Sequence, residues 1–267
     1  MSEQTSTTDL TVRRVRHPIK VRLLQVRRTQ LLSPHQLLIT LGGPDLADFV
    51  TASFDNHVKL MWAPDGLGVP ELPTVGPEGL QWKPDAPRPL MRDYTPRRFD
   101  AQALELDIEF ALHGDGPAAN WARQAQPGQS LAVGGPRGSF IVPMGFDWHL
   151  LVGDDSALPA IARRLEELPA GKKAIVVLAL DPADRRALDT RADLTLVWVD
   201  EPADLPAAVQ ALQLPAGEGH AWASGEAHAM AEVRKLLVGQ HGLDKSRMRA
   251  SAYWKRGQAD HHEALDA

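Results

Sequence analysis

The hydrophobic pattern changes its period near residue 145, and this change limits the possible fold more than any other feature. Before it, apolar residues form short segments with the two-residue period of a strand, as in Leu104, Leu106, Ile108 and Phe110. After it, strand-like segments alternate with helix-like ones, which is typical of a parallel sheet with helices on its faces. The sequence therefore predicts a β-barrel or sandwich followed by an α/β domain.

The individual elements follow from the same pattern. In the first half, strands are expected at 21–26, 37–41, 58–62, 104–110, 131–133 and 140–142. The Pro- and Gly-rich segment 64–89 is expected to be a long loop, or a hairpin interrupted by one. In the second half, strands are expected at 149–152, 174–180, 194–199, 220–223 and 248–254, with helices at 157–168, 205–212 and 225–240. We place an N-terminal tail at 1–14, the β domain at 15–145 and the α/β domain at 146–267.

Composition excludes several classes of chemistry. Cysteine is absent, which excludes disulfides, thiolate zinc sites, cysteine-ligated iron–sulfur clusters and cysteine nucleophiles. A chain that moves electrons without these groups needs a non-covalent organic cofactor. The formal net charge of −5 argues against a protein that coats nucleic acid.

The chain also lacks the apolar segments of a membrane protein. No apolar run approaches the roughly 20 residues that span a bilayer, and the polar first ten residues do not resemble a signal peptide. We therefore expect a cytoplasmic monomer with no integral membrane segment and no nucleic-acid partner.

Residues 92–99, Arg-Asp-Tyr-Thr-Pro-Arg-Arg-Phe, place a guanidinium, an aromatic ring and a hydroxyl within four positions. On an extended strand Arg92 and Tyr94 share one face, while Thr95 points the other way and keeps its backbone amide available. A flavin dinucleotide needs a positive charge for its pyrophosphate, a planar partner for its ring and hydrogen bonds at its polar ring edge. The alternative for this segment, taken alone, is an ordinary surface strand.

Residues 113–122, His-Gly-Asp-Gly-Pro-Ala-Ala-Asn-Trp-Ala, follow the alternating strand and open a predicted short helix. Glycines before a helix let backbone N–H groups approach a phosphate at the positive end of the helix. The alternative is a plain strand-to-helix turn with Pro117 at the first helical position.

Together and in this order, the two segments resemble the siderophore-interacting protein family, FAD-dependent ferric-siderophore reductases within the ferredoxin-reductase-like superfamily. The resemblance continues through residues 55–60, 134–139, 153–160, 222–226 and 253–257, and it extends from about Val15 to Ala264. It implies a β-barrel FAD-binding domain followed by an α/β, parallel-sheet, NAD(P)-binding-like domain. It also implies FAD as cofactor and NAD(P)H as electron donor.

The resemblance assigns cofactor-binding roles residue by residue. It implies that Arg92 binds the pyrophosphate, that Tyr94 stacks on the isoalloxazine ring and that Thr95 bonds the polar ring edge. The backbone stretch that contacts the FAD phosphates would include His113, Gly116, Pro117 and Ala118. The nicotinamide dinucleotide is expected at residues 153–159, with Asp154 and Ser156, facing Ser224 and Glu226, and Trp254 is expected to close over the flavin.

The resemblance also implies a basic cluster that holds the ferric chelate, made of Lys59, Arg137 and one of Lys255 or Arg256. A ferric tris-catecholate carries about three negative charges, so several fixed cations beside the electron donor would favour its binding. Taken singly, a basic residue of this kind is usually a solvated surface side chain.

Use of a nicotinamide donor depends on the resemblance alone. Residues 154–156, Asp-Asp-Ser, also read as an ordinary helix N-cap, and no Gly-x-Gly-x-x-Gly occurs there, so a ferredoxin is an alternative donor. Arg185 and Arg186 are candidates for contact with a 2′-phosphate. They could equally be solvated side chains at the start of a helix, with Asp181 and Asp184 as their ion-pair partners.

The function that follows is reduction of a ferric siderophore by NAD(P)H through FAD, with release of Fe(II) for iron assimilation. No protein nucleophile or general base is needed, so no catalytic side chain is predicted. The alternatives are a flavin reductase that feeds a protein redox partner and a non-catalytic ferric-siderophore-binding protein.

Two further segments have simpler interpretations. Residues 260–263, Asp-His-His-Glu, have the side chains of a metal site, but adjacent side chains diverge, so we expect a hydrophilic tail and no metal. The basic residues between Arg13 and Arg28 are expected to form the solvent face of the first strand.

Overall fold

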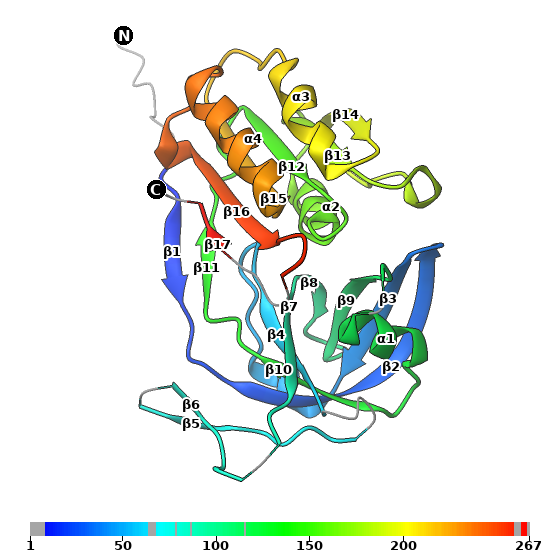
Figure 1. The fold of residues 1–267 in the computed structure, drawn as a ribbon. Coiled ribbons are helices and arrows are strands. Elements are labelled where there is room, and N and C mark those ends of the chain that lie inside the picture. The colour runs from blue at the N-terminus through cyan, green and yellow to red at the C-terminus, as the bar shows by residue number, and fades with distance from the viewer. Residues whose placement is uncertain are drawn as a thin grey trace.

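The structure is a computed structural model that describes residues 9–63, 68–77, 79–85, 87–114, 116–258 and 263–265. Figure 1 shows a β domain, built from the first half of the chain, below an α/β domain built from the second half. The predicted order of the two modules is therefore confirmed.

The β domain is built on a seven-stranded antiparallel sheet in the order β7-β4-β10-β2-β3-β9-β8. Thr95 alone separates β7 from β8 in the chain, although they are the two edges of this order. The sheet must therefore curl until its edges meet, which produces a partly open barrel. The strands are β2 (Val21–Ser33), β3 (Gln36–Gly42), β4 (Val58–Trp62), β7 (Leu90–Tyr94), β8 (Pro96–Asp100), β9 (Glu105–Ala111) and β10 (Ser130–Gly134).

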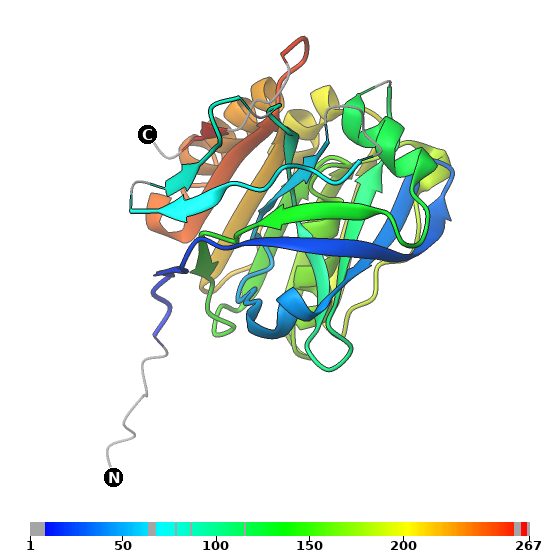
Figure 2. The ribbon, with the colours of Figure 1, turned by 90° about the horizontal axis from the view of Figure 1, so that it is seen from below.

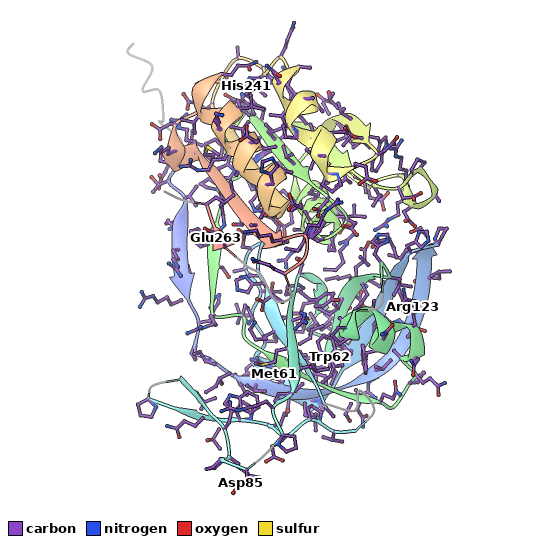
Figure 3. All side chains as sticks on the ribbon, in the orientation of Figure 1. Met61, Trp62, Asp85, Arg123, His241 and Glu263 are labelled. Atoms are coloured by element: carbon purple, nitrogen blue, oxygen red, sulfur yellow. The ribbon has the colours of Figure 1, made fainter. Side chains whose placement is uncertain are left out.

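Apolar side chains from alternate positions fill the barrel. Leu106, Ile108 and Phe110 of β9 are fully buried, as their two-residue period predicts. Trp62, labelled in the lower domain in Figure 3, packs on Trp121 of helix α1 (Pro117–Gln124), with 5.9 Å between ring centroids. Helix α1 is thus attached to the barrel core through its apolar face.

The structure corrects two expectations for this strand. Leu104 lies in the preceding turn with φ 51°, so β9 begins one residue later than predicted. The polar positions Asp107 and Glu109 are also buried, at 7% and 3% exposure. Glu109 has no open solvent face because Arg186 of the α/β domain pairs with it.

Smaller elements flank the barrel. Strand β1 (Arg13–Arg16) pairs with β11 (Gly138–Ile141) in a separate ribbon. The segment predicted as a loop or interrupted hairpin contains the hairpin β5 (Thr74–Gly76) and β6 (Gly79–Gln81). Figure 2 shows this hairpin at one side of the barrel strands.

The expectation that all basic residues of 13–28 face solvent is wrong for one of them. Arg22 is 5% exposed and donates hydrogen bonds to the carbonyl oxygens of Asp45 and Gly135 and to the Asp48 carboxylate. Asp45 and Asp48 belong to the short helix η1 (Pro44–Asp48), which Arg22 therefore ties to the sheet. These polar partners explain why a guanidinium is tolerated inside the domain.

The α/β domain holds a six-stranded sheet in the order β14-β13-β12-β15-β16-β17, parallel except for β17. Helix α2 (Leu158–Glu167) covers the face toward the β domain, where it shares a core with Phe54 and Val142. Helices α3 (Leu205–Gln210) and α4 (Ala227–Gly239) cover the other face. The strands are β12 (Trp148–Gly153), β13 (Lys173–Ala179), β14 (Asp193–Val199), β15 (Gly219–Glu226), β16 (Met248–Trp254) and β17 (Glu263–Ala264), with short helices η2 (Pro182–Asp184), η3 (Pro202–Asp204) and η4 (Lys245–Arg247).

The order of this sheet contains a topological switch point. From β12 the chain proceeds to β13 and β14 on one side and then crosses to β15 on the other. In open α/β sheets, ligands bind in the crevice outside the carboxyl ends of the strands at such a point. The topology therefore predicts a ligand site near Gly153 and Glu226, where β12 and β15 end.

Apolar packing and polar contacts join the two domains. Phe54 of the β domain packs edge-on against Trp222 of β15, with 5.5 Å between centroids. Arg163 of α2 donates hydrogen bonds to the Thr51 hydroxyl and to the Pro96 carbonyl oxygen, at 2.8 and 3.0 Å. Because Pro96 begins β8, this arginine anchors α2 beside the seam of the barrel.

Candidate functional site

A cleft of about 920 Å³ lies between the domains, at the switch point of the α/β sheet. Its walls come from the junction of β7 and β8, the start of α1, the loop after β12, the ends of β13 and β14, and the segment at the end of β16. Ligand sites of proteins occupy about 300–1,000 Å³, so the cleft is large enough for a dinucleotide. The structure brings eleven of the sixteen predicted site residues to its surface: Arg92, Tyr94, Thr95, His113, Gly116, Pro117, Ala118, Asp154, Ser156, Trp254 and Arg256.

The barrel seam contributes Arg92, Tyr94 and Thr95. The Tyr94 ring lies 4.5 Å from that of Phe110, centroid to centroid, so the barrel core supports it from behind. Burial raises the pKa of the Tyr94 hydroxyl well above its usual value, although the charge of Arg92 opposes the shift. Tyr94 therefore acts as a neutral aromatic surface at any physiological pH.

The start of α1 contributes a second wall. Gly116 precedes the helix in an extended conformation, Pro117 occupies its first turn, and Gly116 to Ala119 all line the cleft. The first N–H groups of a helix have no partner within it and favour anions. Arg123, labelled on this helix in Figure 3, donates hydrogen bonds to the carbonyl oxygens of Leu112 and Gly114 and so fixes the loop that carries His113.

His113 connects this loop to the α/β domain. Its Nε2 lies 2.9 Å from a carboxylate oxygen of Asp155. The hydrogen bond to Asp155 raises the pKa of His113 above its usual value, while partial burial opposes the shift. A charged histidine is therefore favoured at the edge of the cleft.

The carboxylate of Asp154 is the most engaged group in the α/β wall. It is 1% exposed and accepts hydrogen bonds from the backbone N–H and hydroxyl of Ser156, the backbone N–H of Glu226 and Nε1 of Trp254. Burial, and secondarily the charge of Asp155, raise the pKa of Asp154 to about 7, and the hydrogen bonds only partly offset this shift. The alternative of an ordinary N-cap at residues 154–156 is wrong, because the N-cap of α2 is Ala157 and has no side-chain cap bond. The Asp154 carboxylate instead connects the loop after β12 to Glu226 and Trp254.

Five predicted residues are not among the described residues that line the cleft: Ser224, Glu226, Lys59, Arg137 and Lys255. Ser224 is fully buried. The Glu226 carboxylate caps α4 by accepting the backbone N–H groups of His228 and Ala229. Both residues thus support the end of β15 from beneath the cleft.

The predicted basic cluster is only partly assembled. Lys59 pairs with Asp93 at 2.9 Å, and Asp93 itself lines the cleft. Arg137 and Lys255 are exposed outside the cleft, whereas Arg256 is exposed and lines it. Of the two C-terminal candidates, Arg256 is therefore the one beside the cleft.

Arg185 and Arg186 have different partners from those predicted. Arg185 pairs with Asp200 and also donates to the Leu180 carbonyl oxygen, while Arg186 pairs with Glu109 of the barrel. Asp184, one of the predicted partners, instead accepts from His35. Of the segment 260–263, which was predicted to be a hydrophilic tail, residues 260–262 lie outside the described part of the chain.

The cleft also contains residues for which no individual role was predicted, among them His57, Glu109, Asp155 and Tyr253; of these, Asp155 lies within the predicted dinucleotide loop 153–159. Asp155 and Tyr253 adjoin predicted residues, so proximity to a motif was the available signal. The place of Glu109 in the cleft could not be predicted, because polar residues at alternate positions of a strand normally indicate the face exposed to solvent.

The donor set fits an FAD-type dinucleotide. The start of a helix, a guanidinium and an aromatic surface supported by the core lie on one wall of a single cleft. The Tyr94 hydroxyl and the Thr95 backbone add polar groups where the barrel edges meet. These are the groups that a pyrophosphate and a planar ring with a polar edge require.

Comparisons with known proteins agree with this geometry. Residues 25–140 match the family model of the siderophore-interacting FAD-binding domain, and residues 146–257 match that of the siderophore-interacting protein. The chain is 39% identical to the NADPH-dependent ferric-chelate reductase of Escherichia coli, over 90% of this chain and 95% of that protein. It is 33% identical to the ferric vibriobactin reductase ViuB of Vibrio cholerae, over 91% and 93%.

Solved structures give the same result. A siderophore utilization protein from T. fusca superimposes with a TM-score of 0.84 at 36% identity, covering 94% of this chain and 98% of that one. A ferredoxin reductase of carbazole 1,9a-dioxygenase, 18% identical, superimposes with a TM-score of 0.62, which shows the shared fold alone. By family model, sequence identity and structure, the chain belongs to the siderophore-interacting protein family, with a ferredoxin-reductase-like fold.

Proposed function

We propose that the interdomain cleft is the place where this chain, an FAD-dependent ferric-siderophore reductase that uses NAD(P)H, carries out its reaction. The observation that carries the proposal is the assembly of Arg92, Tyr94, Thr95 and the start of α1 around one cleft at the switch point of the α/β sheet. Relatives matched over nearly their whole length are named as reductases of ferric chelates and of ferric vibriobactin.

The cofactor roles proposed for the barrel wall follow from the chemistry of each group. Arg92 and the N–H groups at the start of α1 bind the pyrophosphate, because both offer positive charge without a competing carboxylate in the first helical turn. Tyr94 supports the flavin ring, and Thr95 bonds its polar edge. Bound FAD supplies the conversion of two-electron donor chemistry into single-electron steps.

The roles proposed for the α/β wall concern the electron donor. The loop 153–159 and the ends of β13 and β14 receive the nicotinamide dinucleotide, with Asp154 and Ser156 shaping the loop and Ser224 and Glu226 supporting it. Arg185 lies near the ends of both strands, and its bond to the Leu180 carbonyl holds it there. No side chain has to act as nucleophile or general base.

The ferric chelate is the substrate, and we propose that Arg256, Arg137, Lys59 and Lys255 attract it to the cleft entrance. Fe(III) binds hard anionic oxygens more tightly than Fe(II) does, so reduction loosens the chelate and releases iron. Arg256 is the cation best placed for this role, because it lines the cleft and is exposed.

Other features remain predictions. No helix among the described residues is long and apolar enough to cross a membrane. Cell fractionation tests the predicted cytoplasmic location, and sedimentation tests the predicted monomeric state. A direct reduction assay with reduced ferredoxin tests ferredoxin as an alternative donor. The division into domains at residues 145 and 146 is supported by the separate sheets on either side.

The proposal is tested by stopped-flow spectroscopy of the purified holoprotein. We expect bleaching of the flavin absorbance on mixing with NADPH or NADH, and reoxidation on adding a ferric siderophore. The Arg92→Ala variant should retain less FAD, whereas Arg88→Ala, an exposed arginine that packs on Trp82 outside the cleft, should retain it fully. Reduced flavin that fails to reduce ferric chelates but readily reduces a protein acceptor would overturn the proposal. A protein that binds the chelate but is not reduced by any donor would also overturn it.

A further inference from the structure

One carboxylate joins the ends of three parallel strands at the cleft. Asp154 follows β12, and its Oδ2 accepts the Glu226 N–H at the end of β15 and the Trp254 Nε1–H at the end of β16, both at 2.8 Å. Its Oδ1 accepts from Ser156. In all four hydrogen bonds the carboxylate is the acceptor. An ionised carboxylate has about four acceptor sites, so these bonds use all of them.

The backbone around Asp154 is shaped to admit this carboxylate. Gly225 has φ +153°, and a Cβ at that position would lie 2.5 Å from Oδ2 of Asp154. A Cβ on Gly153 would lie 2.7 Å from the Ser224 carbonyl oxygen. Glycine at these two positions therefore lets the strand ends close around the Asp154 side chain.

Trp254 differs from the other donors to Asp154. The other three donors are the backbone N–H of Glu226 at the end of β15 and the backbone N–H and hydroxyl of Ser156 in the same loop as Asp154. The indole is a side chain that lines the cleft at the start of an exposed segment, 255–258, where Lys255 and Gln258 form an isolated bridge. Its orientation therefore depends strongly on the bond to Asp154.

We propose that Asp154 is a positioning residue for the reductase reaction: its ionised carboxylate fixes the Trp254 indole as a wall of the cleft, and loss of that bond slows electron transfer from the donor to the flavin. This inference rests on the proposed function of the cleft. Tyr94 contributes the aromatic surface on the barrel side, and Trp254 contributes one on the α/β side. Reactants in a narrow cleft react faster when its walls are fixed, because correct orientation removes part of the entropic barrier.

Protonation of Asp154 would break the arrangement, because a carboxylic acid directs its own hydrogen toward one of the four donors. Burial places this titration near neutral pH, with a pKa of about 7. The ionisable groups facing the carboxylate are Asp155 in the same loop, which is paired with His113 of the barrel, Glu226 at the end of β15, and Tyr253 of β16. Arg92 lines the same cleft. The bond to Trp254 is therefore expected to hold above pH 7 and to weaken below it.

The test compares Trp254→Phe, which keeps an aromatic ring but removes the donor, with Asp154→Asn and with the double variant. The readouts are the pH profile of flavin reduction by NADPH, the Kd for FAD, and hydrogen exchange of residues 249–258. Each single variant should slow flavin reduction at pH 8 about tenfold, since the loss of a fixed cleft wall removes part of the orientational advantage. Each should also speed exchange in 249–258, with the FAD Kd changed less than threefold.

The decisive result is that the losses of rate in the two single variants do not add in the double variant. In the Trp254→Phe background, Asp154→Asn should cause less than a twofold further loss, and the titration near pH 7 should disappear from the rate profile. If Asp154→Asn fails to fold, Trp254→Phe alone must remove that titration and speed the exchange. Trp82→Phe, outside the cleft, is the control and should resemble the unmodified protein.

Two outcomes overturn the inference. One is additive losses in the double variant, which would mean that Asp154 acts independently of Trp254. The other is an unchanged pH profile and unchanged exchange in Trp254→Phe. Failure of the proposed function gives a different result, because the unmodified holoprotein would then not be reduced by NADPH, NADH or reduced ferredoxin, while the exchange measurement would still report on the bond.

Discussion

Replacing Glu109 with Gln should weaken the attachment between the two domains. Glu109 lies on β9 with a side chain only 1% exposed, and Arg186 of the α/β domain pairs with it. Arg97 approaches its other oxygen at 3.9 Å. The substitution removes the negative charge while keeping the size of the side chain, so the effect reports on electrostatics rather than on packing.

The magnitude follows from which cation loses its partner. Removing one member of a buried ion pair costs about 3–5 kcal/mol. Arg97 keeps its two bonds to Glu166, so Arg186 is the cation left without a carboxylate. Because the Arg186 side chain is 23% exposed, water compensates part of the loss, and we expect a cost of about 2 kcal/mol. For a chain of this size, that corresponds to a fall in Tm of about 4–8 °C.

Differential scanning calorimetry of Glu109→Gln measures this fall directly. Glu105→Gln is the matched control, because Glu105 sits on the same strand and pairs with Arg28, whose side chain is 53% exposed. Breaking that exposed pair should cost less than about 1 kcal/mol. Equal changes in Tm for the two variants would refute the reasoning, since they would show that burial at the domain interface does not strengthen the pair.

Three other predictions concern pH, cofactor and substrate. Burial lowers the pKa of His149 to about 2 and that of His220 to about 3. Both therefore stay neutral in the folded protein, and their stabilising contribution is present above pH 6.5 and lost as the pH falls. Each should cost about 1.4 kcal/mol per pH unit below that point, and His220→Leu should reduce the slope in urea unfolding between pH 6.5 and 5. Tyr94→Ala should raise the Kd for FAD about tenfold in fluorescence titrations, whereas Tyr94→Phe should leave it nearly unchanged; full occupancy of the alanine variant would exclude a stacking role. Lys59→Ala should raise the KM for an anionic ferric chelate, and adding Asp93→Asn should restore it if Lys59 acts by neutralising its partner; an equal KM in all three proteins would remove Lys59 from the substrate site.

The architecture was predictable because both modules rely on simple periodicities. The alternating apolar residues of β9 and the buried run of β13 identify their strands without tertiary information. Element ends were less predictable. Strand β15 continues to Glu226, and α4 begins after it, because the Glu226 carboxylate caps the helix.

The candidate site was predictable where a motif is local and not where partners come from distant parts of the chain. Arg92, Tyr94 and Thr95 lie in one segment, so their common location in the cleft follows from the geometry of a strand end. The pairing of Lys59 with Asp93 and of Arg186 with Glu109 depends on strand register and on domain packing. Neither can be read from spacing, and both change the charge that a ligand would meet.

The acidic character of the cleft needs an explanation, because its proposed ligands are themselves anionic. Among the residues that the structure describes, seven carboxylates line it, against two arginines and two histidines, and the negative potential of this set alone would repel phosphate. The carboxylates are Asp93, Glu109, Asp154, Asp155, Asp181, Asp200 and Glu201.

Ion pairs with neighbouring residues neutralise four of these seven carboxylates. Lys59 neutralises Asp93, Arg186 neutralises Glu109, His113 pairs with Asp155, and Arg185 pairs with Asp200.

The remaining carboxylates are engaged with N–H groups. Asp181 and Glu201 accept backbone N–H groups at the starts of η2 and η3, and Asp154 receives four donors inside the wall. The guanidinium of Arg92, which lines the cleft, and the start of α1 then determine the potential on the barrel wall. An anionic dinucleotide is therefore expected to bind first along that wall, and the acidic side of the cleft is expected to bind its ligand more weakly and to exchange it between turnovers.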